Sequence, residues 1–279
     1  RMSTRHGDPG RLRTVRCGLH QICVIVMTLA KNLFKARLAK PETQIGLWMA
    51  LAHPGAAEIC AGAGFDWLVI DAEHGPNGLA EIMAQLRVLS GSSHPVVRVR
   101  ENDRALIKQM LDIGAQTILV PMIETAVEAQ EAVGSVRYPP EGARGVGAAL
   151  ARASDYGRIT DYLHTANKQV CLLVQVESCK GIDALDEILA VEGVDGVFVG
   201  PADLAADMGY VGKPEAAPVQ AVVVEALSRI RAAGKPAGIL TSNRELAQRY
   251  ELMGVEFLAV GADVGVFARG LAELRQAFP

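Results

Sequence analysis

Several side chains capable of chemistry stand at or directly after the ends of short apolar runs. They are His74, Arg98, Gln175, Glu177 and Asp203, which combine carboxylates and an amide with one imidazole and one guanidinium. Carboxylate and amide oxygens form a hard, oxygen-rich site that suits Mg²⁺ or Mn²⁺, and also Co²⁺, rather than a metal that prefers thiolates. These residue types therefore predict a divalent metal site.

A divalent cation in such a site would polarise a 2-oxo acid and stabilise the enolate that forms when the C3–C4 bond breaks. Arg98 would hold a carboxylate or offset developing oxyanion charge, and His74 would move the proton. Each residue taken alone has a common structural role, since a Glu after a strand often caps a helix or forms an ion pair. Only the convergence of the whole set favours catalysis, and it depends on the elements that carry these residues.

Eight short apolar runs predict eight strands, and helical patterns separate them. The runs do not alternate with polar residues, which is typical of parallel strands buried on both faces. The predicted strands are Ile45–Ala50, Trp67–Asp71, Pro95–Val99, Thr117–Pro121, Val170–Val176, Gly196–Gly200, Pro236–Leu240 and Phe257–Gly261. The predicted helices include Gly78–Leu89, Arg104–Ile113, Ala126–Val136, Ile182–Ala190, Val219–Ala233 and Arg244–Met253. Eight β units, each followed by a helix, predict an α/β protein with a (β/α)₈ TIM barrel.

The predicted barrel would bring the chemical side chains to one mouth, because active sites of this fold lie at the carboxyl ends of the strands. The period of two along a strand points Gln175 and Glu177 to the same face. Residues 137–168 are the longest departure from the repeat, and a loop this long is more often functional than decorative. Its partial Gly145-Val146-Gly147 motif lacks a third Gly and a preceding strand, so we interpret it as a flexible active-site loop and not as a dinucleotide-binding motif.

A Schiff-base aldolase is the main chemical alternative, and it requires a Lys that projects from the barrel. None of the eight Lys falls inside a predicted strand, and only Lys180 could reach the mouth. P-loop, HExxH and GxSxG motifs are also absent from the sequence. The lysine positions therefore favour a metal-dependent mechanism.

The composition and charge of the 279-residue chain exclude several classes of protein. Half of the residues are hydrophobic, which excludes an intrinsically disordered chain, and the formal net charge of −3 gives no indication of a nucleic-acid surface. The five cysteines are odd in number and form no CxxC pair, which favours a reducing, cytoplasmic compartment over a disulfide framework.

The first residues differ in charge from the rest of the chain. Residues 1–26 carry five Arg and one Asp, and the apolar run at 22–30 is too short to span a bilayer. We interpret residues 1–26 as a non-native or disordered leader before a start at Met27, and residues 27–279 as a single barrel domain. No membrane partner is expected.

Long blocks of the sequence resemble the class II, metal-dependent pyruvate aldolases of the HpcH/HpaI aldolase family. The resemblance runs from about Met27 to Phe278 and includes AGAGFDWLVIDAEHGPN (61–77), RYPPEGARGVGAALARAS (137–154), LVQVES (173–178) and VEGVDGVFVGPADLAADMGY (191–210). It implies a barrel of the phosphoenolpyruvate/pyruvate type that assembles as a homohexamer. It also implies retro-aldol cleavage of a 4-hydroxy-2-oxo acid to pyruvate and an aldehyde, with Mg²⁺, Mn²⁺ or Co²⁺ as cofactor.

The same resemblance implies which residues bind the metal and the substrate. Glu177 and Asp203 would be the metal ligands. Gln175, the backbone at Ala202 and again Asp203 would hold the pyruvate portion.

The resemblance also implies three catalytic residues. His74 would accept the proton, Arg98 would stabilise the enolate, and Asp112 would raise the basicity of His74. Glu73 would contact metal-bound water. Ala72 stands where the family commonly has Gly, which would narrow the backbone approach beside His74 without removing a reactive group.

The aldehyde half of the substrate is the least determined part of the prediction. We favour 4-hydroxy-2-oxoheptanedioate, which would give pyruvate and succinic semialdehyde. Enzymes that cleave 2-keto-3-deoxy-L-rhamnonate or 2-dehydro-3-deoxyglucarate share nearly all of these blocks, and the difference would lie near Trp48, His53 and the loop after Asp203. The sequence is also compatible with an oxaloacetate decarboxylase or synthase that uses the same enolate, and with a non-enzymatic barrel that binds 2-oxo acids.

Overall fold

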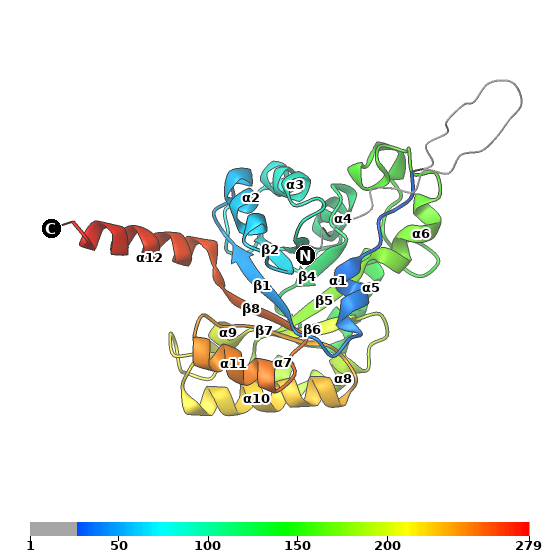
Figure 1. The fold of residues 1–279 in the computed structure, drawn as a ribbon. Helices are drawn as coiled ribbons and strands as arrows, with labels where there is room; N and C mark the ends of the chain where they lie inside the picture. Colours follow the sequence, from blue (N-terminus) through cyan, green and yellow to red (C-terminus); the bar gives the residue numbers. More distant parts are fainter. Residues whose placement is uncertain (1–26, 279) are drawn as a thin grey trace, which may run out of the picture.

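Eight parallel strands close into a barrel in sequence order, and β8 pairs back to β1 (Figure 1). The structure is a computed structural model that describes residues 27–278. The strands are β1 (Gln44–Met49), β2 (Trp67–Asp71), β3 (His94–Arg98), β4 (Thr117–Val120), β5 (Cys171–Val176), β6 (Gly196–Val199), β7 (Ala237–Leu240) and β8 (Phe257–Ala262). The predicted (β/α)₈ barrel is confirmed, and each predicted strand end lies within one residue of the observed end.

Helices follow the strands, and all of them except the last lie around the outside of the barrel. They are α2 (Pro54–Gly62), α3 (Leu79–Val88), α4 (Arg104–Asp112), α5 (Ala126–Val136), α6 (Tyr162–Gln169), α7 (Cys179–Asp183), α8 (Leu185–Leu189), α9 (Pro201–Asp207), α10 (Ala217–Ala232), α11 (Arg244–Leu252) and α12 (Asp263–Gln276). The helix predicted at 182–190 is interrupted at Ala184, which ends α7 and begins α8. Most of the 137–168 loop is irregular, and α6 closes it.

Large and small side chains alternate inside the barrel. A Cβ atom on Gly46 of β1 would lie 2.2 Å from the ring of Trp67, and one on Gly238 of β7 would lie 2.0 Å from the ring of Phe257. Both positions therefore require glycine, because the aromatic rings of the neighbouring strands occupy the space of a side chain. The result is a packed interior and not a pore.

Helix α1 (Leu33–Leu38) closes the amino end of the barrel. The ring of Phe34 stacks on His94 with centroids 5.4 Å apart and meets Phe257 edge-on at 6.0 Å. The side chain of Asn32, which caps α1, donates hydrogen bonds to the carbonyls of Gln116 and Gln169. Side chains thus fill this end of the barrel, and the carboxyl end of the strands is left for a ligand.

The last helix, α12, does not cover the barrel. In Figure 1 it projects away from the body of the molecule. Among the helices of residues 27–278, none is both long and apolar enough to cross a membrane. The leader interpretation, together with Cys17 and Cys23, concerns residues outside the described part of the chain.

Candidate functional site

Alternate residues of each strand point into the barrel, and the last inward position of several strands carries a polar side chain. Trp67 and Val69 belong to the inner cluster, so Asp71 is the next inward residue of β2. In β3, Val96 is followed in the same way by Arg98, which is the register partner of Asp71. The strand period therefore gathers these groups in one layer at the mouth.

Arg98 is held at the mouth by two carboxylates. Its Nε donates to Asp71 Oδ1 at 2.9 Å and its Nη2 donates to Asp71 Oδ2 at 2.7 Å, while its Nη1 lies 2.7 Å from Glu73 Oε2. The indole of Trp48 donates to Asp71 Oδ2 at 3.2 Å, and the guanidinium carbon lies 5.0 Å from the centre of the Trp48 ring. Because the side chain is buried and forked, it presents its charge in one orientation.

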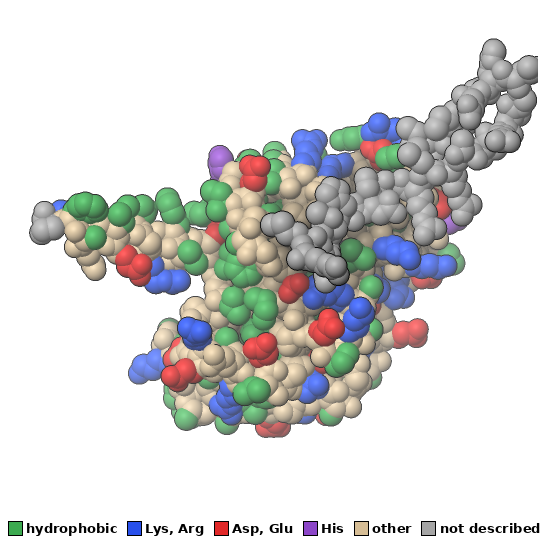
Figure 2. Space-filling model, in the orientation of Figure 1, with side chains coloured by type: hydrophobic (Ala, Val, Ile, Leu, Met, Phe, Trp, Pro, Cys, Tyr) green, Lys and Arg blue, Asp and Glu red, His purple; other side chains and the backbone are tan. Residues whose placement is uncertain are grey.

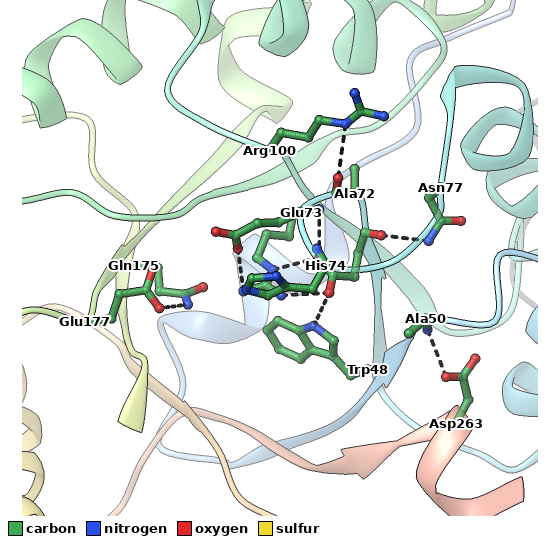
Figure 3. A network of polar contacts seen from close by, with 12 residues as sticks. Trp48, Ala50, Ala72, Glu73, His74, Asn77, Arg100, Gln175, Glu177 and Asp263 are labelled. Carbon is green, nitrogen blue, oxygen red and sulfur yellow. Dashed lines mark hydrogen bonds and ion pairs between the residues drawn. The ribbon is translucent and has the colours of Figure 1, made fainter. Parts of the chain in front are cut away.

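The loop after β2 places His74 beside this guanidinium. Asp71 Oδ1 also accepts the backbone N–H groups of Glu73 and His74, at 3.0 and 3.4 Å. The Asn77 side chain donates to the Asp71 carbonyl at 2.7 Å. Figure 3 shows Glu73 and His74 on one side of the mouth, facing Gln175 and Glu177 on the other, with Trp48 below. One carboxylate, Asp71, therefore orients both the arginine and the histidine loop.

Gln175 and Glu177 share one face of β5 and its end, as predicted, and the amide of Gln175 donates to Glu177 Oε2. The N–H of Met122 donates to Glu177 Oε1 at 2.9 Å. A Cβ atom on Gly200 would lie 2.3 Å from Glu177 Oε2 and 3.1 Å from Gln175 Nε2. Because Gly200 has no side chain, Glu177 and Gln175 can both occupy the space beside it.

The electrostatics of the mouth favour a bound cation. Burial, with the like charges of Asp203 and Glu73, raises the pKa of Glu177 to about 7. Burial also raises the pKa of Glu73, although the charge of Arg98 opposes this. Burial would raise the pKa of Asp71 too, but the hydrogen bonds and charge of Arg98 outweigh it and hold that pKa below its usual value.

The donor set of the mouth fits a hard cation. Four carboxylates, those of Asp71, Glu73, Glu177 and Asp203, influence one another here, with the guanidinium of Arg98 among them. The buried Gln175 Oε1 has no hydrogen-bond partner. Within residues 27–278, no group of three or more His, Cys, Asp or Glu side chains is arranged to hold a metal ion by itself. The chemical type of these oxygen donors is the type that a hard divalent cation prefers.

Asp112 is not joined to His74 within the chain. Instead its Oδ1 accepts from Arg144 Nη2 at 2.7 Å, and no ion pair or hydrogen bond between Asp112 and His74 is found in the described residues. Arg144 comes from the 137–168 loop and is buried, with its guanidinium carbon 4.3 Å from the centre of the Tyr138 ring. The loop therefore contacts the end of α4 through an arginine that the sequence analysis did not single out.

The remaining candidates, Ala202, Asp203 and Lys180, lie in the helices that follow β6 and β5. Ala202 and Asp203 lie in the first turn of α9, which begins at Pro201. The N-cap residue Gly200 offers no side chain to the first-turn amides, so no cap side chain occupies the Ala202 amide. Lys180, the one lysine considered for a Schiff base, points to Glu124 at 2.9 Å and is largely exposed. The structure therefore gives no support to a Schiff-base lysine at Lys180.

Asp71 and Gly200 are the site residues that the sequence analysis left without a role. Asp71 could have been assigned from the strand period, because it continues the inward row of Trp67 and Val69. The need for glycine at Gly200 could not be predicted from the sequence, because it arises from the position of Glu177 at the end of the neighbouring strand.

Fold and mouth together define a (β/α)₈ barrel with an acidic, arginine-containing site at the carboxyl ends of its strands. The sequence profile of the HpcH/HpaI aldolase/citrate lyase family matches residues 44–270. The chain belongs to this family, and it is an aldolase, an enzyme that cleaves a carbon–carbon bond to release an aldehyde.

Relatives with curated names are similar over nearly the whole length. The chain is 54% identical over 253 residues to a hydroxypyruvate/pyruvate aldolase of Pseudomonas aeruginosa, covering 90% of this chain and 94% of that protein. It is 53% identical over 249 residues to a 4-hydroxy-2-oxo-heptane-1,7-dioate aldolase of Salmonella arizonae, covering 89% and 95%. The crystal structure of a family member from Burkholderia cenocepacia has 40% identity and a TM-score of 0.85, covering 88% of this chain and 99% of the other.

Proposed function

We propose that the protein cleaves a 4-hydroxy-2-oxo acid between C3 and C4, with a divalent cation held by Glu177 and Asp203. The preferred substrate is 4-hydroxy-2-oxoheptanedioate, which yields pyruvate and succinic semialdehyde. When bound, the cation supplies a Lewis acid that polarises the 2-oxo group and offsets enolate charge. Mg²⁺, Mn²⁺ and Co²⁺ would each suit the oxygen ligands that Glu177 and Asp203 offer.

Some side chains around the cation site would bind the substrate, and others would transfer the proton or stabilise charge. Gln175 and the amide of Ala202 hold the carboxylate and oxo groups of the pyruvate portion, with Asp203 touching both substrate and cation. His74 accepts the proton of the C4 hydroxyl as the C3–C4 bond breaks, and the electron pair of that bond passes to C3 and the oxo group. Return of one proton to C3 then converts the enolate into pyruvate. Arg98 stabilises the resulting enolate charge.

One observation carries this proposal: Glu177, Asp203 and Glu73 meet at one mouth closely enough for burial and like charge to raise the pKa of Glu177 to about 7. A cation removes this repulsion, so the site gains free energy when it is loaded. The anchored guanidinium of Arg98 stands beside it, held at 2.7 Å from both Asp71 and Glu73.

Asp112 keeps the proposed role of raising the basicity of His74, although within one chain it is paired with Arg144. The pH dependence of turnover tests this role. The midpoint of the acid side of the kcat/KM profile should differ between the Asp112→Asn variant and the parent, because Asp112 would no longer support proton acceptance by His74. An unchanged midpoint would assign Asp112 to the support of the 137–168 loop alone.

Pyruvate release from 4-hydroxy-2-oxoheptanedioate is the decisive experiment. Release should require Mn²⁺, Co²⁺ or Mg²⁺, stop with excess EDTA and return when metal is restored. His74→Ala and Arg98→Ala should each reduce turnover by at least about 10²-fold, with the circular dichroism spectrum unchanged. Release that persists in EDTA would contradict the cation mechanism. No release with this substrate, together with cleavage of a sugar-acid analogue, would move the assignment to the rhamnonate or glucarate enzymes.

A second candidate substrate class follows from the relatives. Two of them, at 54% and 56% identity, are named hydroxypyruvate/pyruvate aldolases, which is as similar as the heptanedioate enzymes at 53%. Hydroxypyruvate would present its 2-oxo acid group to the same residues. Comparing pyruvate and hydroxypyruvate as nucleophiles in the reverse reaction, with succinic semialdehyde and a short hydroxyaldehyde as acceptors, separates the two candidates. Oxaloacetate, tested in parallel, addresses decarboxylation.

The family resemblance further supports a homohexamer and a cytoplasmic location for this enzyme. The mass of the purified protein in solution, measured by light scattering, tests the hexamer. Fractionation of the producing cells tests the location.

A further inference from the structure

The connection from β4 to α5 runs beside the end of β5, where Gln175 and Glu177 lie. It consists of residues 121–125, which we call the strap. Two consecutive backbone N–H groups of the strap donate to residues of the β5 end. The N–H of Met122 donates to Glu177 Oε1 and the N–H of Ile123 donates to the Gln175 carbonyl, each at 2.9 Å. The strap therefore continues from β4 along β5 and contacts a proposed metal ligand.

The backbone of Met122 lies in the left-handed region, with φ at 53°. In an extended strand, successive N–H groups point to opposite sides, so two in a row cannot both face β5. The left-handed backbone between the N–H groups of Met122 and Ile123 breaks this alternation and brings both to the β5 side. A residue with a Cβ atom rarely adopts this conformation, and residues held in it cluster at functional sites. The Met122 side chain is 48% exposed, so its packing is a weak reason for the unfavourable backbone.

The contact with Met122 orients Glu177 and leaves it able to bind. Glu177 is buried, and a buried carboxylate requires hydrogen-bond donors. The Met122 N–H occupies one acceptor position of Oε1, and the Gln175 amide occupies one of Oε2. A carboxylate oxygen has two lone-pair positions, so each oxygen keeps one for a further ligand.

The side chain of Glu124 fastens the strap to the residue that follows Glu177. Its Oε1 accepts the Ser178 hydroxyl at 2.7 Å, and the Ser178 oxygen accepts the Gly181 N–H at 3.1 Å. Ser178 is 6% exposed, so its hydroxyl has one orientation, in which the proton is donated to Glu124. The backbone N–H of Glu124 donates to Glu128 Oε2 of α5 at 2.8 Å. The strap is thus held at the end of β5 and at the start of α5.

Lys180, the second partner of the Glu124 side chain, contributes less. Its Nζ lies 2.9 Å from Glu124 Oε2, but the lysine side chain is 62% exposed, against 26% for the glutamate. Figure 2 shows acidic and basic side chains interspersed over the body of the molecule, and an exposed ion pair of this kind contributes little to stability. The bond from the buried Ser178 hydroxyl is therefore the one that holds the strap.

The first turn of α7 packs tightly against the strap. A Cβ atom on Gly181 would lie 2.9 Å from the Ile123 carbonyl oxygen and 2.9 Å from Val176 Cγ1. Helix α7 therefore leaves the strap no room to shift toward it while Glu124 remains bound to Ser178.

We propose that Glu124 and the left-handed Met122 are positioning residues for Glu177. Glu124 holds the strap, the strap presents the Met122 N–H, and this N–H sets the orientation of the Glu177 carboxylate before a cation binds. The inference rests on the proposed function, because it takes Glu177 as a metal ligand. It deepens that function by giving a role to two residues outside the proposed ligand set.

Titration calorimetry with Mn²⁺ on full-length Glu124 variants tests the side chain. Glu124→Ala should weaken the Mn²⁺ affinity about tenfold, because Ser178 loses its acceptor and the strap loosens. Glu124→Gln should bind within about twofold of the parent, because its amide oxygen still accepts the Ser178 hydroxyl. Lys180→Ala is the matched control and should keep the parental affinity. An unchanged affinity of Glu124→Ala, an equal loss in Lys180→Ala, or no recovery in Glu124→Gln would each overturn the proposal.

Substitutions of Met122 test the backbone independently of Glu124. Met122→Gly keeps the N–H and adopts the left-handed conformation readily, so its Mn²⁺ affinity should stay within about twofold of the parent. Met122→Ile should weaken the affinity about tenfold, because a β-branched residue disfavours the left-handed region and the N–H would turn away from Glu177. A parental affinity of Met122→Ile would overturn the proposal. An equal loss in Met122→Gly would do so too, because it would assign the effect to the methionine side chain.

Glu177→Gln in the same titration separates this proposal from the proposed function. If Glu177→Gln abolishes Mn²⁺ binding while Glu124→Ala and Met122→Ile bind like the parent, the cation site stands and the positioning role is wrong. If Glu177→Gln binds like the parent, both are wrong. Circular dichroism spectra that match the parent show that each variant is folded, and Met122→Ile decides the outcome if Glu124→Ala is not.

Discussion

Asp71 holds Arg98 by two parallel hydrogen bonds, from Nε at 2.9 Å and from Nη2 at 2.7 Å, and both side chains are buried. The same carboxylate accepts the backbone N–H groups of Glu73 and His74. Asp71 thus orients Arg98, the proposed stabiliser of the enolate, and His74, the proposed proton acceptor. It has neither of these roles itself.

Asp71→Asn should lower kcat/KM by about 10- to 100-fold, which corresponds to about 1.4–2.7 kcal/mol of transition-state stabilisation. Asn keeps an acceptor for the loop amides but loses the charge and one of the two acceptors for the guanidinium. Arg98→Lys should lose at least as much, since an ammonium cannot form the forked pair. Steady-state pyruvate release measures both effects. A near-parental kcat/KM for Asp71→Asn would show that Glu73 alone suffices to hold Arg98.

Gly200→Ala should weaken metal binding about 10- to 100-fold, because the new methyl group would lie 2.3 Å from Glu177 Oε2 and must displace that side chain. Titration calorimetry with Mn²⁺ measures the affinity. Gly62→Ala is the matched control, since a Cβ there meets no atom within 4 Å. Equal affinities of the Gly200→Ala variant and the parent would remove Glu177 from the metal site.

Metal binding should release a proton near neutral pH. The pKa of Glu177 is raised to about 7, so a growing share of this carboxyl is protonated as the pH falls below 7, and a cation must displace that proton. The apparent Mn²⁺ affinity should therefore fall as the pH is lowered from 8 to 6. Calorimetry in two buffers of different ionisation enthalpy counts the protons released. A pH-independent affinity would contradict the assignment of Glu177 as a ligand.

Glu177→Gln should stabilise the metal-free protein at pH 8 while abolishing metal binding. A carboxyl whose pKa is raised on folding holds more protons in the folded state than in the unfolded state between its unfolded value, near 4.5, and about 7. Its ionisation therefore costs folding free energy as the pH rises through that window. The melting temperatures of variant and parent, compared at pH 5 and pH 8 in EDTA, should differ most at pH 8.

His94 should make the fold sensitive to acid. Burial between Phe34 and Thr117 lowers its pKa to about 4 from a usual value of 6.5, so between these values the unfolded state binds a proton that the folded state does not. Above pH 6.5 neutral His94 costs no free energy of unfolding. As the pH falls from 6.5 toward 4, protonation of the unfolded state lowers the free energy of unfolding by about 3 kcal/mol. His94→Gln should flatten this part of the urea-unfolding profile. His164→Gln, at an exposed position on α6, should leave it unchanged.

The strand and helix pattern was predictable from the sequence because apolar runs and helical segments alternate in order along the chain. The inward faces followed from the strand period, which put Gln175 and Glu177 together as the structure confirms. The 182–190 segment was harder, because its apolar spacing suits one helix while the backbone turns at Ala184.

Side-chain contacts between neighbouring strands could not be predicted from the sequence. The pairing of Arg98 with Asp71 depends on the register of β2 against β3, and the space at Gly200 depends on how Glu177 approaches from β5. The partner of Asp112 is Arg144, which reaches it only because the 137–168 loop folds back over the end of α4.

Residue types and the periodicity of strands and helices were enough to predict the barrel and the residues at its carboxyl-end mouth. Both patterns extend over a few neighbouring residues and repeat in every β unit. Only the tertiary structure decided that Asp71 is the carboxylate that holds Arg98 and that burial raises the pKa of Glu177. It also decided that α12 projects away from the barrel. Each of these depends on atoms brought together from separate strands, and no local pattern encodes that distance.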